Sequence, residues 1–211
     1  MNTTDLAIWF SAACRQWQDC YEELTHLDSV AGDGDLGITV RAGAAEVMTA
    51  MNEIDSVQSI GHLLRSCGAA FARGNPSSFA ALTGAGLLAG AKVAGEAVSL
   101  DSDQAASCLE AAASKISERG NAQLGDRTVL DALVPSIEAL RSAPAGIQVA
   151  LTTMVEAAST GVKATADMPP AKGRAAWVGE RGRGYPDGGA TAYLRLLEAL
   201  LASQSDSPKQ I

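Results

Sequence analysis

Three aspartates stand close together in the stretch HLDSVAGDGDLGITV, residues 26–40. Asp28, Asp33 and Asp35 fall within eight residues, with glycines beside the last two. Carboxylates packed that closely repel one another unless a cation lies among them. Oxygen ligands favour hard ions, and Mg²⁺ completes its coordination with water and substrate phosphates, so a few carboxylates suffice. The stretch therefore predicts a magnesium site, beside a helix start whose free N–H groups favour phosphate.

The same stretch admits three other interpretations. Gly32, Gly34 and Gly37 spell GxGxxG, but a helix precedes them where a dinucleotide site needs a strand, and aspartates inside the loop would repel a bare pyrophosphate. An EF-hand calcium loop needs glutamate at its twelfth position, where this loop has Thr39. Aspartate and glycine are also the commonest residues of ordinary turns, so a loop without any ligand is the third alternative.

Two further loops carry groups that suit a nucleotide. In ARGNPSSFAAL, Ser77 and Ser78 come just before a helix, where hydroxyls and free amides can hold phosphate oxygens; a plain serine cap is the alternative. In SERGNAQLGDRTVLDAL, Gly120 precedes a bend and Val129 begins an apolar helix that can pack on a purine. A simple connection between two helices, with Thr128 as the cap, is the alternative for this loop.

A fourth loop is rich in glycine and arginine, KGRAAWVGERGRGYPDGGATAY, residues 172–193. It places Arg174, Arg181 and Arg183 near Asp187 in an otherwise acidic chain. The planar fork of an arginine suits phosphate oxygens. A surface loop with solvated ion pairs is the alternative interpretation.

Apolar residues recur at steps of three and four along most of the chain, which predicts helices. Hydrophobic residues make up 47% of the sequence and aromatic residues 4%, a balance that suits helices packed closely through small side chains. No convincing alternating strand is found. We expect an all-α fold and one domain over residues 1–211. The expected helices cover residues 6–24, 37–51, 59–73, 77–98, 101–120, 128–140, 146–166 and 188–202.

Bulk properties limit the partners. The net charge of −8 argues against nucleic acid and anionic membranes, because an acidic surface repels both. The four cysteines show no CxxC spacing and are expected to be reduced. The N-terminal stretch does not resemble a secretory signal, and no apolar run approaches the roughly 20 residues of a spanning helix. We expect a cytoplasmic protein.

Taken together, these motifs resemble the nucleotide-binding L subunit of dihydroxyacetone kinase. The motifs are D-x4-D-G-D-x-G, a serine loop, GDRTxLDA and GRAxxxGERxxGxxDxGA, in that order. The resemblance covers nearly the whole chain and implies an eight-helix antiparallel barrel. It also implies that interhelical loops bind ADP or ATP at one end of the barrel.

Site residues follow from the resemblance, position by position. Asp28, Asp33 and Asp35 become ligands of two magnesium ions, and Arg174 becomes the catalytic residue. The implied nucleotide-binding positions are Leu36, Thr39, Ser77, Ser78, Gly120, Val129, Arg174, Asp187, Gly188 and Gly189. Many relatives read GDGDHGxN and GGSSG where this chain has Leu36, Thr39 and an Asn75-Pro76 loop. This chain therefore lacks an imidazole and an amide that can reach the phosphates, and proline stiffens the serine loop.

The resemblance further implies a partner protein. In this family the ketose is held on a separate K-type subunit through a covalent hemiaminal with a histidine, so this chain alone should not phosphorylate a sugar. The phosphoryl donor is ATP or a phosphotransferase-system protein that recharges bound ADP, and the ketose has three or four carbons. A non-catalytic nucleotide-binding regulator and a purely structural helical module are the alternatives.

Overall fold

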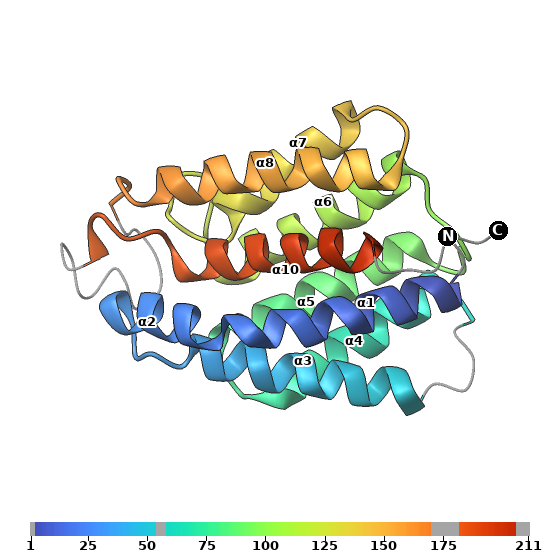
Figure 1. Cartoon of the computed structure of the whole chain (residues 1–211), viewed down its shortest axis with the longest axis horizontal. Coiled ribbons are helices and arrows are strands. Elements are labelled where there is room, and N and C mark those ends of the chain that lie inside the picture. Colours follow the sequence, from blue (N-terminus) through green and yellow to red (C-terminus); the bar gives the residue numbers. More distant parts are fainter. Residues whose placement is uncertain (1–2, 54–57, 170–181, 206–211) are drawn as a thin grey trace.

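The computed structural model describes residues 3–53, 58–169 and 182–205, and all regular structure in them is helical, as the sequence predicts. Figure 1 shows most helices running along the long axis of the molecule. The elements are α1 (Thr3–Trp17), the 3₁₀ turn η1 (Gln18–Cys20), α2 (Tyr21–Ala31), α3 (Leu36–Glu53), α4 (Ile60–Gly74), α5 (Ser78–Ala94), α6 (Ser102–Gly120), α7 (Leu130–Ser142), α8 (Ile147–Thr165) and α10 (Gly188–Ser205).

These helices form a closed ring. Going round it, α1 packs on α3, α3 on α4, α4 on α5, α5 on α6, α6 on α7, α7 on α8, α8 on α10, and α10 returns to α1. Successive helices run in opposite directions, so every second connection lies at the same end. The expected eight-helix antiparallel barrel is therefore confirmed, with α2 as an extension of the first helix.

Small residues set the spacing between neighbouring helices. A Cβ added to Gly68 of α4 would meet the carbonyl of Gly84 on α5, and the reverse substitution meets the carbonyl of Gly68. Gly90 of α5 lies in the same way against the carbonyl of Cys108 on α6. At these glycines the backbone of one helix lies directly against the carbonyl groups of the next. Any larger side chain at these positions would force the two helices apart.

Two tryptophans close the ring at the seam between α1 and α10. Trp9 donates its indole N–H to the carbonyl of Leu200 at 2.8 Å, and Trp17 donates to the carbonyl of Ala192 at 2.8 Å. Trp17 also stacks on Phe71 of α4, with ring centroids 5.5 Å apart. Each indole therefore buries its polar group with a partner while its rings fill the core.

The structure corrects one expected helix end and confirms the expected end of α6 at Gly120. The first helix was expected to end at Leu24, but after η1 it continues as α2 to Ala31, which puts Asp28 in a helical turn. The left-handed residue after α6 is Asn121, with φ 46°, and Gly120 still belongs to the helix. Among the described residues, no helix is both long and apolar enough to cross a membrane.

Candidate functional site

A cavity of about 520 Å³ opens at one end of the ring. It lies where the connections α2–α3, α4–α5 and α6–α7 meet the start of α10. The residues that line it include the following predicted positions: Asp28, Asp33, Asp35, Leu36, Ser77, Ser78, Gly120, Val129, Asp187, Gly188 and Gly189. Four loops that are far apart in the sequence therefore contribute to one site.

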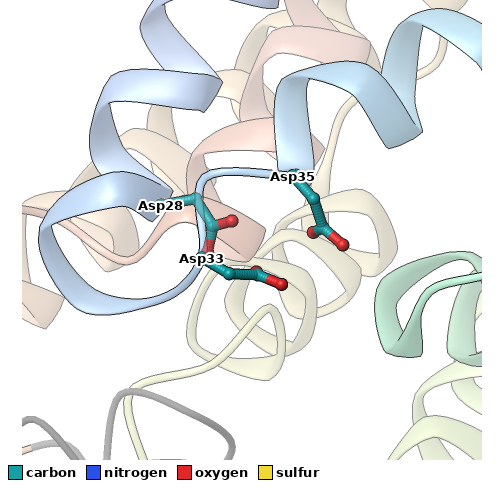
Figure 2. A group of neighbouring side chains, drawn as sticks. All are labelled: Asp28, Asp33 and Asp35. Carbon is teal, nitrogen blue, oxygen red and sulfur yellow. The ribbon is translucent and has the colours of Figure 1, made fainter.

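The three aspartates form one cluster at this cavity (Figure 2). Asp28 lies in the last turn of α2, Asp33 in the loop, and Asp35 directly before α3. One carboxylate oxygen from each lies within 4.8 Å of the others. Asp28 is held in place because its Oδ2 accepts a hydrogen bond from the backbone N–H of Leu36 at 3.2 Å.

The electrostatics of this cluster suit a cation. Burial, and then the charge of Asp28, raise the pKa of Asp35 above its usual value. Both effects mean that the ionised carboxylates are unfavourable together without a positive charge. Three oxygen donors at this spacing fit a hard divalent ion such as Mg²⁺, which takes its remaining ligands from water or phosphate.

The serine loop is organised by a chain of hydrogen bonds. The side-chain amide of Asn75 donates to Thr39 Oγ1 at 2.8 Å, and that hydroxyl donates to Ser77 Oγ at 3.1 Å. Ser77 Oγ also accepts the N–H of Ala80 at 3.1 Å, so Ser77 is the N-cap of α5. A hydroxyl oxygen accepts two hydrogen bonds, so the hydrogen of Ser77 remains to donate into the cavity.

Thr39 is a predicted nucleotide-binding position whose side chain does not line the cavity. Its side chain is fully buried on α3 and is absent from the cavity lining, behind Ser77. The two departures from the family pattern, Thr39 and Asn75, bond directly to each other. Leu36, the third departure, packs in the core beside Gly188.

One wall of the cavity is apolar. Its lining includes Phe79, Leu82, Ile116, Ala122 and Val129, which come from α5, α6 and the connection to α7. A Cβ added at Gly189 would contact both Phe79 and Val129, so the glycine leaves room between them. Such a wall suits a flat apolar ring. Of these residues only Val129 was predicted, because inward-facing residues on a buried helix look the same as ordinary core residues.

Asp187 lines the cavity and caps the last helix, α10. Its Oδ2 accepts the N–H of Ala190 at 2.7 Å, and its own N–H donates to Thr165 Oγ1 at 2.8 Å. Burial raises the pKa of this carboxyl from 3.8 to about 6, against the hydrogen bond from Ala190 and the charge of Arg127, which both lower it. The carboxyl therefore caps the helix and holds its proton to a higher pH than an ordinary aspartate.

Arg127 is a lining residue that the motifs did not single out. It is 4% exposed and donates to the carbonyls of Gly182 and Tyr185. Its signal in the sequence is the arginine of the GDRT motif, which occurs easily by chance. Arg174, the predicted catalytic residue, and Arg181 lie outside the described residues, whereas Arg183 is exposed.

The chain belongs to the DAK2 domain family, whose model matches residues 30–202. It is 27% identical over 203 residues to the ADP-binding subunit DhaL of the PEP-dependent dihydroxyacetone kinase of Escherichia coli K12, covering 95% of this chain and 96% of that protein. It is 32% identical to the corresponding subunit of dihydroxyacetone kinase 2 of Listeria innocua, covering 84% of each. The expected resemblance to the nucleotide-binding L subunit is thereby confirmed.

Longer proteins also match. D-erythrulose kinase of Mycolicibacterium smegmatis is 34% identical, and this chain covers 32% of its length. The crystal structure of the dihydroxyacetone kinase from C. freundii in complex with AMP-PNP and Mg²⁺ superposes with a TM-score of 0.73 at 24% identity, covering 96% of this chain and 34% of that one. The chain thus spans about a third of these kinases, and the structural match shows the shared fold.

Thr39→Val tests the hydrogen-bond chain behind Ser77. The substitution keeps the shape but removes the hydroxyl that Asn75 and Ser77 share, so the free energy of unfolding should fall by about 1–3 kcal/mol. Urea denaturation measures this. Thr49→Val is the matched control on the same helix, because the exposed Thr49 hydroxyl bonds only the carbonyl of Ala45, and it should change stability by less than about 0.5 kcal/mol. Equal effects of the two substitutions would contradict the arrangement.

Asp187→Asn tests the raised pKa of the cap. A carboxyl whose pKa is higher in the folded state stabilises the fold below its ordinary pKa of 3.8, and this stability is lost as pH rises through about 6. Asparagine keeps the capping oxygen but cannot ionise. The stability of the variant relative to the parent should therefore increase between pH 4 and pH 7, measured by urea denaturation with EDTA present. Parallel pH profiles would show that the carboxyl is not perturbed.

Proposed function

We propose that this chain is the ADP- or ATP-binding subunit of a small-ketose kinase. The observation that carries the proposal is the gathering of Asp28, Asp33 and Asp35 at the mouth of a cavity that also has a capping serine and an apolar wall. A Mg-nucleotide needs those three features together: oxygen ligands for the metal, donors for phosphate and a flat apolar surface for the base. The relatives named as ADP-binding subunits support the same assignment.

Each part of the cavity has a role in this proposal. The three carboxylates would hold two magnesium ions, whose charge would offset that of the phosphates. Ser77 donates its hydroxyl hydrogen to a phosphate oxygen, assisted by the free amides at the start of α5. The base lies between Gly120 and Val129. Thr39 contributes through Ser77 and not by direct contact.

Phosphoryl transfer needs two further components. Arg174 is the proposed catalytic residue, placing a guanidinium beside the transferring phosphoryl group, as the family resemblance implies. The ketose is held by a separate K-type subunit, as the family resemblance implies. The chain itself supplies metal binding, orientation of the polyphosphate and a dry wall for the base.

The proposal allows two phosphoryl donors and two ketose substrates. Relatives named as PEP-dependent kinases favour bound ADP that a phosphotransferase-system protein recharges, whereas ATP exchange is the alternative. The D-erythrulose kinase relative supports a four-carbon ketose as the alternative to dihydroxyacetone. Sugar choice resides on the K-type partner in either case.

Asp33→Asn should abolish tight binding of Mg-ADP while leaving the helical fold intact. We expect at least about a 100-fold loss of affinity, because losing even a residue that orients a metal ligand weakens metal binding about 10- to 100-fold. Isothermal calorimetry with ADP, with and without Mg²⁺, measures this. Asp19→Asn removes the same charge from the exposed turn η1 and should bind like the parent. Magnesium-dependent binding that survives Asp33→Asn would contradict the assignment.

Reconstitution with a K-type subunit should give ketose phosphorylation that neither protein shows alone. Dihydroxyacetone and erythrulose are each supplied with ATP or with phosphorylated phosphotransferase protein, and the sugar phosphate is quantified. Denaturing the purified subunit and identifying the released nucleotide separates the donors, since abundant ADP after extensive dialysis favours recharging. Nucleotide binding without turnover under every combination would instead support a regulatory role.

A further inference from the structure

Arg127 joins two walls of the cavity that are far apart in the sequence. Its guanidinium Nη2 donates to the carbonyl of Gly182 and, at 2.9 Å, to that of Tyr185. These two carbonyls bracket one tight turn, in which the N–H of Tyr185 donates to the carbonyl of Gly182 and Gly184 takes a φ of 84°. The Nη1 and Nη2 end of the guanidinium also lies close against Gly182, since a Cβ there would come within 3.3 Å of Nη2, Nη1 and Cζ.

The backbone around Arg127 is built to aim the side chain inward. Arg127 has a φ of 60°, a left-handed conformation that residues other than glycine seldom adopt. Buried Asp131 holds it there, because its two carboxylate oxygens accept the N–H groups of Gly125 at 2.6 Å and Thr128 at 2.7 Å. The first turn of α7 thus fixes the loop, and the loop directs the guanidinium toward the turn at 182–185.

The turn that Arg127 holds leads directly into the predicted phosphate side of the site. The turn is anchored on α8 by the N–H of Gly184 on the carbonyl of Ala166, and Asp187, two residues after Tyr185, begins α10. Arg127 Nη1 has no hydrogen-bond partner among the described residues. Nη2 therefore donates to the two carbonyls of the turn. The charge of the guanidinium also acts on the nearby carboxyl of Asp187.

We propose that Arg127 is a positioning residue that couples the base-side loop, residues 120–129, to the turn and cap, residues 182–189, so that both walls are set for the nucleotide before it binds. The proposal rests on the proposed function only for the identity of the ligand. The class of ligand is a magnesium-bound nucleoside diphosphate or triphosphate. Arg127 itself contacts backbone and not the reacting atoms.

Arg127→Met removes the donors while keeping a long side chain. Without the clamp the turn must become ordered on binding, so affinity for Mg-ADP should fall by about tenfold, and amide exchange in residues 182–190 should accelerate while α3 and α4 keep their protection. Arg127→Lys retains a donor within reach of the carbonyls and should recover part of both losses. Calorimetry and hydrogen–deuterium exchange measure the two effects.

Gly182→Ala adds a methyl group that collides with the guanidinium while the arginine stays in place. This variant tests the same contact if Arg127→Met does not fold. It should give the same localised increase in exchange. Arg119→Met, which removes another positive charge from the cavity lining, should leave exchange in residues 182–190 unchanged. Affinity within twofold of the parent, or faster exchange spread evenly over all helices, would overturn the proposal. A parent protein that does not bind Mg-ADP would refute the proposed function, while the exchange data would still decide the role of Arg127.

Discussion

Close approach of the helix backbones is the constraint on which the rest of this structure depends. Gly68, Gly84 and Gly90 let α4, α5 and α6 lie against each other's carbonyl groups, and the two tryptophans of α1 close the ring on α10. In a narrow antiparallel ring, alternate connections must converge on one end. The convergence of chemically different loops is therefore a consequence of small residues placed far from the site.

The convergence of these loops brings several acidic side chains together, and their negative charges repel one another. Asp28, Asp33 and Asp35 are brought near one another and near the start of α10, where the half-buried cap Asp187 and the buried Asp131 add further acidic groups. Arg127 is a positively charged residue buried beside these acids. The end of the ring thus combines an acidic edge open to metal with an interior where each acid is committed to backbone N–H groups.

The sequence was sufficient for the parts that depend on residue type. Apolar spacing predicted the helices, and the cluster of three aspartates was predicted because these acids and their glycines are close together in the chain. The continuation of the first helix to Ala31 was missed, because His26, Asp28 and Ser29 are polar and look like loop residues, although a helix end facing solvent tolerates them. Arg127 was missed because its partners are carbonyl oxygens, which every residue possesses, and a sequence gives no sign of which ones a guanidinium will reach.

The hydrogen bond between Asn75 and Thr39 couples these two positions. Each is the other's partner inside the protein, so replacing one alone strands a polar group that its neighbour can no longer satisfy. We expect the two residues to change together between homologues. Grafting one loop without the facing helix would transfer only one partner of this hydrogen bond.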